Sequence, residues 1–130
     1  MSIWTDFDIY CAALASWREA RGEGRDGIRG VIHVIANRAK LANKSWAEII
    51  YQKWQFSSMT AADDPQLDLV PKPPDAVFSD CCEIASLISA GGDFDLTDGA
   101  THYFATSIAE PEWAKDMTFT IQIGHQRFYK

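Results

Sequence analysis

The feature that most constrains this fold is a broad apolar face on the helix predicted at residues 26–41. Apolar residues recur there at spacings of three and four, which places them on one side of a helix: Ile28, Val31, Ile32, Ile35 and Ala39. Val34 widens this side beyond the stripe that is typical of a surface helix. Such a helix must be covered from several directions, so we expect it to be central and well buried.

A first helix is predicted to open at Thr5, three residues before Asp8. This spacing is that of a capping box, in which two side chains bond to free backbone N–H groups at a helix N-terminus. The helix is expected to run to about Arg21, where Gly22 and Gly24 interrupt the pattern. Its apolar side is predicted to carry Phe7, Tyr10, Cys11 and Leu14.

Two more helices and one long loop complete the helical part. Ser45 and Glu48 form a second capping box, which predicts a short helix to about residue 54. Residues 57–75 contain four prolines and little periodicity, so we expect a long loop with at most a turn of helix. Residues 76–90 are predicted to form another long helix, which two glycines stop.

The C-terminal part has a different pattern. Residues 118–123 alternate polar and apolar side chains, as a half-buried strand does. Gly124 and His125 can turn the chain into a partner strand at 126–129. We therefore expect an α+β fold, mostly helical, with residues 1–130 forming a single domain that has a small C-terminal β element.

The composition argues against several classes of function. A net charge of −6 disfavours nucleic-acid binding, where neutralisation of phosphates supplies much of the affinity. The three cysteines are odd in number and two of them are adjacent, so we interpret them as small buried residues and not as a disulfide framework. The three histidines lack the spacing of a metal site, and we expect neither a metal nor a cofactor.

Residues 19–27 are the stretch that can carry chemistry, because a helix ends there in Glu19 and a glycine-rich break follows at once. The helix can hold this carboxyl rigidly, while the small residues beyond it leave room for a bulky substrate. Cleavage of a glycosidic bond needs a carboxylic acid whose pKa is raised by burial, so that it is protonated near neutral pH. From spacing alone, a surface ion pair with Arg18 or Arg21 is the commoner explanation of Glu19.

Further short motifs follow in a definite order. They are Val-x-x-Val-x-x-Asn-Arg at 31–38, Gln-Phe-Ser at 55–57, Ala-Thr-His-Tyr at 100–103, Pro-Glu-Trp at 111–113 and an Ile-Gly to Phe-Tyr segment at 123–129. Together with Glu-Ala-Arg-Gly-Glu at 19–23, this ordered set resembles the cell-wall hydrolase family that includes the catalytic domain of spore-cortex-lytic enzymes. The resemblance covers nearly the whole chain, from about residue 9 to residue 129.

The resemblance implies a compact relative of the lysozyme and lytic-transglycosylase fold. It also implies cleavage of the β-1,4 bond between N-acetylmuramic acid and N-acetylglucosamine in peptidoglycan, with Glu19 as the catalytic acid and base. One carboxyl suffices for lytic transglycosylation, because the 6-hydroxyl of the muramic acid attacks its own anomeric carbon. Two residues depart from the family pattern: Gly24 replaces a usual proline, and His102 stands where the family has an aromatic or small polar residue.

Other residues are assigned around this carboxyl. Glu23 is the second catalytic candidate, because a continued helix would place it one turn from Glu19; its alternative is a structural bond to the glycine loop. Tyr103 is predicted to donate a hydrogen bond to the sugar or to Glu19, against a role as a core aromatic. The residues predicted to bind the glycan, for which turn capping or core packing is the structural alternative, are Gln55, Phe56, Ser57, His102 and Trp113.

Three other functions stay open at this point. A hydrolytic muramidase would use water in place of the 6-hydroxyl. A thiol-dependent wall amidase or peptidase would use Cys81 or Cys82 with a histidine base, but both cysteines fall inside a predicted helix and not at its N-terminus. A non-catalytic glycan-binding module would need the aromatic residues but not Glu19.

The expected partner is the peptidoglycan glycan strand, with no nucleic acid and no integral membrane segment, and we expect a monomer. The N-terminus has no basic stretch followed by an apolar one, which is the mark of a secretory signal. We therefore expect synthesis in the cytoplasm without a signal peptide and action on the cell wall after release or export. This combination is typical of a phage-type endolysin.

Overall fold

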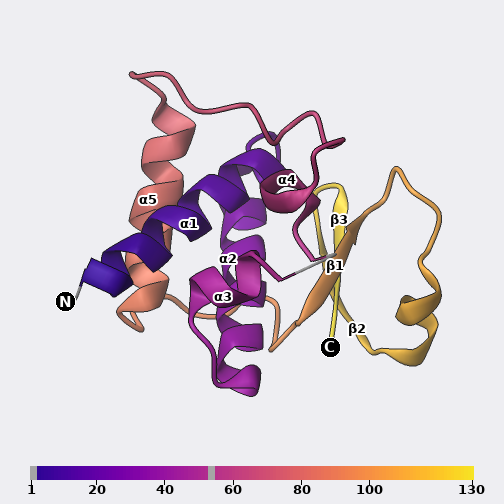
Figure 1. Cartoon of the computed structure of the whole chain (residues 1–130). Coiled ribbons are helices and arrows are strands. Elements are labelled where there is room, and N and C mark those ends of the chain that lie inside the picture. Colours follow the sequence, from indigo (N-terminus) through magenta and orange to yellow (C-terminus); the bar gives the residue numbers. More distant parts are fainter. Residues whose placement is uncertain (1–2, 53–54) are drawn as a thin grey trace.

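Helix α2 (Gly24–Ala42) lies at the centre of the computed structural model, which describes residues 3–52 and 55–130. Helix α1 (Ile3–Ala20) crosses in front of α2 in Figure 1, and α5 (Ala76–Ser89) packs against both. All six residues of the predicted apolar face are buried: Ile28, Val31, Ile32, Val34, Ile35 and Ala39. The prediction of a central, well-buried helix is confirmed. No helix in the described part is long and apolar enough to span a membrane.

Helix α1 begins earlier than predicted. Its first residue is Ile3, so Thr5 lies inside the helix and the predicted capping box is wrong. The carboxylate of Asp8 has a different partner, because its Oδ1 accepts a 3.0 Å hydrogen bond from the backbone N–H of Ala47. Asp8 therefore joins α1 to the first turn of α3 (Trp46–Ile50), a contact between distant residues that local spacing does not reveal.

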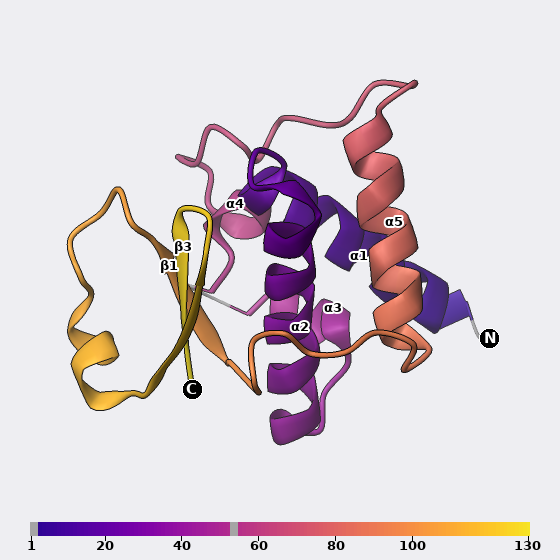
Figure 2. The ribbon, with the colours of Figure 1, turned by 180° about the vertical axis from the view of Figure 1, so that it is seen from behind.

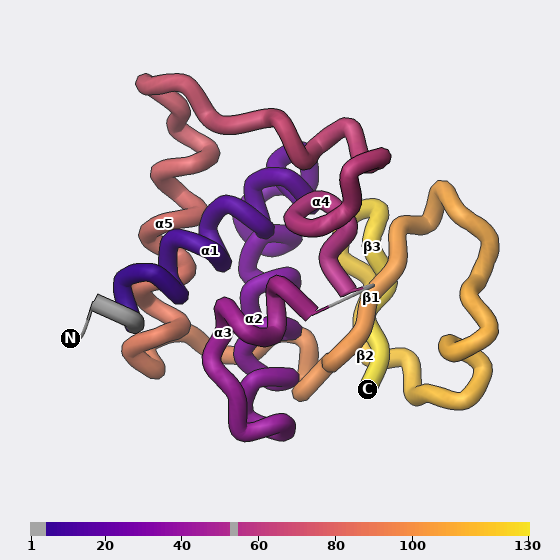
Figure 3. Tube along the Cα trace, in the orientation of Figure 1, coloured from indigo at the N-terminus to yellow at the C-terminus, as the bar shows by residue number. Residues whose placement is uncertain are grey.

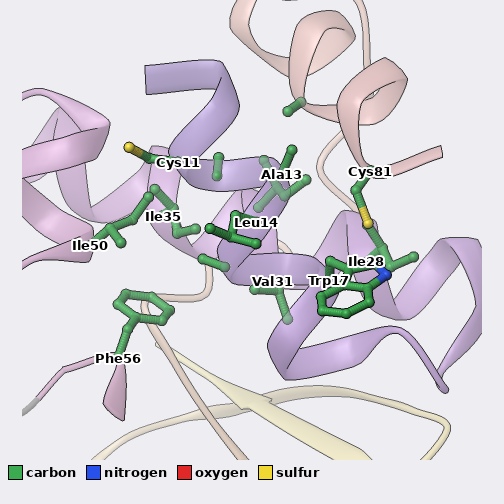
Figure 4. Packing of buried hydrophobic residues seen from close by; sticks show 14 of the residues in the cluster. Cys11, Ala13, Leu14, Trp17, Ile28, Val31, Ile35, Ile50, Phe56 and Cys81 are labelled. Carbon is green, nitrogen blue, oxygen red and sulfur yellow. The ribbon is translucent and has the colours of Figure 1, made fainter. Parts of the chain in front are cut away.

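The buried side of α1 also differs from the prediction. Cys11 and Leu14 are buried as expected, but Phe7 is 47% exposed and Tyr10 is 52% exposed. Every residue from 11 to 17 is buried, because α2, α3 and α5 all pack against this helix. Figure 4 shows side chains of α1 in one packed cluster with those of α2 and α5. A helix covered from several sides does not follow a single apolar stripe.

The second predicted capping box is confirmed. The hydroxyl of Ser45 accepts a 3.2 Å hydrogen bond from the N–H of Glu48, and the carboxylate of Glu48 accepts one of 3.1 Å from the N–H of Ser45. Helix α3 ends at Ile50, earlier than predicted. Trp54, where the sequence places its end, lies outside the described residues.

The predicted long loop contains one turn of helix, α4 (Ser57–Thr60), and otherwise only turns before α5. Arg18 of α1 fastens this loop, because its Nε donates a 3.0 Å hydrogen bond to the carbonyl of Leu69 and its Nη1 one of 3.0 Å to that of Ser58. Figure 3 traces the loop across the top of the molecule from α4 to α5.

A three-stranded antiparallel sheet covers the side of α2 that faces away from α5, as Figure 2 shows from behind. Strands β2 (Phe119–Ile123) and β3 (Gln126–Tyr129) form the predicted hairpin, and β3 is central in the order β1-β3-β2. Strand β1 (His102–Ala105) was not predicted, because it pairs with β3, far along the chain, and no hairpin turn marks the pair in the sequence. The mostly helical α+β fold with a small C-terminal sheet is confirmed, and its extent as one domain over 1–130 stays a prediction.

Helix α2 and the sheet meet at Gly30, where the ring of Phe128 lies on the helix backbone. A Cβ added at Gly30 would lie 2.6 Å from Cζ of Phe128. Phe128 is fully buried in a cluster with Val34 and Ala100, and its ring centroid lies 5.5 Å from that of Tyr103. The missing side chain of Gly30 therefore sets how closely the sheet approaches the helix.

We expect Gly30→Ala to destabilise the fold by about 1–3 kcal/mol, the usual range for an overpacked core. Alanine gains up to about 1 kcal/mol over glycine in a helix, but the clash outweighs this gain. Phe128 is 0% exposed, so its ring cannot move aside without displacing other core side chains. The measurement is urea unfolding. Gly22→Ala is the control, since a Cβ there would meet nothing within 4 Å. An unchanged or raised midpoint for Gly30→Ala would contradict this account.

Candidate active site

Glu19 and Tyr103 form the centre of the candidate site. Glu19 is the next-to-last residue of α1, and Tyr103 reaches it from β1. The phenol of Tyr103 donates a 2.9 Å hydrogen bond to Oε1 of Glu19 across a separation of 84 positions in the sequence. Both residues are partly exposed, so the pair is accessible from outside. The contact joins the helical part of the molecule to the sheet.

A hollow of about 180 Å³ opens around this pair. It brings together six of the eight predicted site residues: Glu19, Gln55, Phe56, His102, Tyr103 and Trp113. Three lining residues were not singled out from the sequence, namely Val34, Arg38 and Thr101. Each of them falls within a motif of the sequence, but motif membership does not tell which side chains point into a hollow.

Glu23 does not line the hollow. Helix α1 ends at Ala20 and α2 begins at Gly24, so the continued helix that would place Glu23 one turn from Glu19 does not exist. Oε2 of Glu23 accepts a 3.2 Å hydrogen bond from the backbone N–H of His125 and lies 3.3 Å from its Nδ1. Glu23 therefore holds the β2–β3 turn against the connection between α1 and α2, which is a structural bond to the hairpin and not to the glycine loop.

The same turn requires a glycine at position 124. Gly124 has a φ of +56°, which is strained for any residue with a side chain. A Cβ there would also lie 2.6 Å from Oε2 of Glu23. The turn and the carboxylate of Glu23 thus fit each other closely, and this fit sets where β3 begins.

Ser57 also lies outside the hollow, because its hydroxyl donates a 2.6 Å hydrogen bond to Oδ2 of Asp64. Its neighbour Ser58 is fully buried in α4. The hydroxyl of Ser58 faces the carboxyl of Glu19 and lowers its pKa, although it makes no hydrogen bond of standard geometry. The Gln-Phe-Ser motif therefore contributes its first two residues to the hollow, and the serine contact to Glu19 comes from one position later.

Burial raises the pKa of Glu19 above its ordinary value of 4.5, because an ionised carboxylate loses its hydration. The hydrogen bond from Tyr103 and the nearby hydroxyl of Ser58 lower that pKa, since both stabilise the charged form. The negative charge of Asp64 raises it again. Desolvation is the largest of these effects, so the net direction is upward, as a general acid near neutral pH requires.

The neighbouring groups have defined protonation states. Burial, followed by the charge of Glu19, raises the pKa of Tyr103 well above 10, so the phenol keeps its proton and acts as a donor. Burial, followed by the positive charge of Arg38, lowers the pKa of His102 below 6.5, which leaves the ring neutral near neutral pH. The hollow therefore presents a carboxyl, a phenol, a neutral imidazole and a guanidinium.

An aromatic cluster fixes one wall of the hollow. Trp113, in the short 3-10 helix η1 (Glu112–Asp116), makes edge contacts with Phe104 and Tyr129 at centroid distances of 5.9 and 5.6 Å. The ring of His102 lies 5.1 Å from that of Trp113. Trp113 thus packs on buried aromatics and also lines the hollow, so the core and binding interpretations apply to the same side chain.

The three cysteines are free, and Cys11 and Cys81 are buried as predicted, whereas Cys82 is only half-buried. Burial raises the pKa of Cys81 to about 11 and also raises that of Cys82, so both thiols stay protonated near neutral pH. This argues against a cysteine nucleophile, which must be a thiolate. In the described ranges 3–52 and 55–130, no group of three His, Cys, Asp or Glu side chains is placed to hold a metal ion.

Comparison with known proteins identifies one family and two similar solved structures. The model of the Cell Wall Hydrolase family matches residues 22–129. The catalytic domain of the germination-specific lytic transglycosylase SleB from Bacillus anthracis is 27% identical, with a TM-score of 0.73 over 100% of this chain and 97% of that chain. The catalytic domain of the Bacillus cereus SleB protein is 28% identical, with a TM-score of 0.73 over 96% and 91%. A search of curated proteins found no match.

We expect Glu19→Gln to raise the melting temperature near neutral pH, because an amide carries no charge to desolvate. A raised folded-state pKa means that the carboxyl favours folding below its unfolded-state pKa and loses that contribution as the pH rises through the folded value. The gap between variant and wild type should therefore close below about pH 4.

Calorimetry at a series of pH values measures this gap. Glu23→Gln is the matched control, since it makes the same chemical change outside the hollow, where an amide oxygen can still accept the hydrogen bond from the backbone N–H of His125. A melting temperature for Glu19→Gln at or below that of the wild type near neutral pH would show that burial does not disfavour the charged carboxyl.

Proposed function

The chain belongs to the cell wall hydrolase family, and we propose that it is a lytic transglycosylase that cleaves the β-1,4 bond between N-acetylmuramic acid and N-acetylglucosamine in peptidoglycan. The observation that carries this proposal is the hydrogen bond between Tyr103 and Glu19 in an open hollow. It orients a carboxyl whose pKa is raised by burial at a place where a polymer can reach it.

Glu19 acts twice in the proposed reaction. It first donates its proton to the glycosidic oxygen as the bond to the muramic acid anomeric carbon breaks. The carboxylate then accepts the proton of the 6-hydroxyl, whose oxygen bonds to the same carbon and gives a 1,6-anhydro product. Tyr103 engages Oε1 and fixes the rotation of the carboxyl, which leaves Oε2 to exchange the proton. The enzyme ends the cycle with Glu19 protonated, as it began.

The number of carboxyl groups at the hollow favours this reaction over hydrolysis. In the described part of the chain, Glu19 is the only acidic residue that lines the hollow. A retaining hydrolase uses a second carboxyl about 5 Å away as its nucleophile. Asp64 influences the pKa of Glu19, but its carboxylate binds Ser57 and does not line the hollow. A muramidase mechanism, the alternative, would have to recruit Asp64.

The other lining residues are proposed to bind the sugars. Gln55 offers an amide to the N-acetyl groups, the neutral ring of His102 can donate or accept a hydrogen bond, and Trp113 offers a face for a sugar ring. Ser57 and Glu23 are proposed instead to shape the loop and the hairpin, since their side chains bind Asp64 and His125. Phe56 is 2% exposed and forms part of the floor.

Action on the wall after release or export, in the manner of a phage-type endolysin, stays a prediction, as do the monomeric state and the absence of a nucleic-acid partner. The amidase or peptidase alternative is disfavoured by the protonated thiols. A glycan-binding module without activity is separated from an enzyme by the experiment below.

The test is digestion of purified peptidoglycan by wild type, Glu19→Gln and Glu23→Gln, with mass spectrometry of the soluble fragments. Wild type should release fragments with 1,6-anhydro muramic ends. Glu19→Gln should cleave about 10²–10⁴-fold more slowly than wild type, since this factor is the usual contribution of a general acid. Glu23→Gln should retain most of it, because an amide oxygen can still accept the hydrogen bond from His125.

Each contrary outcome points to a different alternative. Reducing muramic ends would make the chain a muramidase and direct attention to Asp64. Undiminished release by Glu19→Gln would remove Glu19 from the mechanism. Binding of strands by the wild type without any cleavage would make the chain a glycan-binding module.

A further inference from the structure

Arg38 has an unusual position beside the proposed catalytic carboxyl. In the part of the chain that the structure describes, it is the only lysine or arginine that lines the hollow around Glu19. Its Nη2 donates a long 3.4 Å hydrogen bond to the amide oxygen of Gln52, and its guanidinium lies 6.0 Å from the ring centroid of Phe56. Both of these partners are neutral.

No carboxylate pairs with Arg38 within residues 3–52 and 55–130, and this range contains every Asp and Glu of the chain. Arg25 and Arg29 pair with carboxylates at 2.7 to 3.0 Å. The other three arginines are half-buried and also lack a carboxylate, but each has close neutral partners: Arg18 donates to two backbone carbonyls at 3.0 Å, Arg21 lies 4.4 Å from the ring centroid of Trp17, and Arg127 donates to Gln122 at 3.0 Å. Arg38 combines a single long hydrogen bond with a place in the hollow, and this combination needs an explanation.

Arg38 is a charged group that is partly removed from water. Burial lowers the pKa of Arg38, because the charged guanidinium is partly removed from water. An arginine stays charged all the same, since its pKa remains far above neutral. A partly desolvated charge is unfavourable unless a counter-charge meets it. The hollow itself is where such a counter-charge can arrive.

The shape of the surface places Arg38 on the path of a polymer. A second hollow, of about 350 Å³, lies on the other side of Arg38 and extends to Leu41 and Gln52. The two hollows share Arg38, Thr101 and His102, so they adjoin at these side chains. A strand bound at Glu19 that continues into the second hollow must pass the guanidinium.

We propose that Arg38 binds a carboxylate of the glycan strand and thereby selects the muramic acid unit next to the bond that Glu19 cleaves. This inference rests on the proposed function. The two N-acetyl sugars are otherwise neutral, so a carboxylate is the group that tells them apart by charge. A guanidinium matches a carboxylate with two parallel hydrogen bonds, a geometry that lysine cannot reproduce.

The carboxylate has two possible sources. One is the lactyl group of the muramic acid, which is free where the peptide has been removed. The other is the peptide attached to that lactyl group. Three soluble strands distinguish them: strands with peptides, stripped strands with free lactyl carboxylates, and stripped strands whose lactyl groups are converted to neutral methylamides.

The readout is calorimetric binding of each strand to protein that carries Glu19→Gln, so no cleavage is needed. Adding Arg38→Gln should weaken the binding of carboxylate-bearing strands about tenfold, the usual effect of losing a hydrogen bond to a charged group. The affinity of Arg38→Lys for these strands should lie between those of the parent and Arg38→Gln. Arg25→Gln is the matched control, because it removes the same positive charge from an arginine that does not line the hollow and that pairs with Asp80 and Glu83. It should bind the strands as its parent does.

On the methylamide strands, Arg38→Gln and its parent should bind equally, and the parent should bind them about tenfold more weakly than the strands that carry the recognised carboxylate. An effect on peptide-bearing strands alone would identify the peptide as the source, and an effect on stripped strands would identify the lactyl group. Equal binding of all strands by both proteins, or the same loss on methylamide strands, would overturn the proposal.

The comparison of strands with and without the recognised carboxylate uses the Glu19→Gln protein alone, so it does not depend on how well the Arg38 variants fold. If wild type fails to cleave while the Arg38 dependence holds, the proposed function fails and the carboxylate site stands. If wild type cleaves and the dependence is absent, the carboxylate site fails and the proposed function stands.

Discussion

The burial of one carboxyl at the end of α1 is the constraint on which the rest of this site depends. Removing Glu19 from water raises its pKa, and only the protonated form can act as an acid on a glycosidic oxygen. The surroundings oppose this in part, because the phenol of Tyr103 favours the charged form. This effect also serves the reaction, because the phenol that orients the protonated carboxyl stabilises the carboxylate after the proton has been transferred. The same burial disfavours the folded state near neutral pH, which is a common conflict between stability and activity.

The framework serves to keep this carboxyl and its partner together. Helix α1 packs against α2, α3, α4 and α5, and these contacts hold it in place. On the other side, Tyr103 packs on Phe128, whose ring lies on the bare backbone of Gly30. Glu23 fastens the β2–β3 turn to the connection that follows α1. The distance between acid and phenol is therefore set by packing between α2 and the sheet and not by flexible loops.

Local signals in the sequence were sufficient for several elements and insufficient for others. The broad apolar face of α2, the capping box of Ser45 and the β2–β3 hairpin depend on neighbours a few residues away, and all are found. The partner of Asp8 and the pairing of strand β1 lie far along the chain, which spacing cannot show. Six of the eight site residues predicted from the ordered motifs line one hollow. The position of Glu23 at the hairpin and that of Arg38 in the hollow follow only from the fold. That Arg38 lacks a carboxylate is visible only when every acidic residue has been placed.

The most direct test of this account is the titration of the Glu19 carboxyl by ¹³C NMR, assigned by its loss in Glu19→Gln, in wild type and in Tyr103→Phe. The account predicts a midpoint above 4.5 in wild type, because desolvation is the largest influence on this pKa. It predicts a higher midpoint still in Tyr103→Phe, because the hydrogen bond that stabilises the carboxylate is gone. A wild-type midpoint at or below 4.5, or a fall on removing the phenol, would contradict the claim that burial prepares Glu19 as an acid.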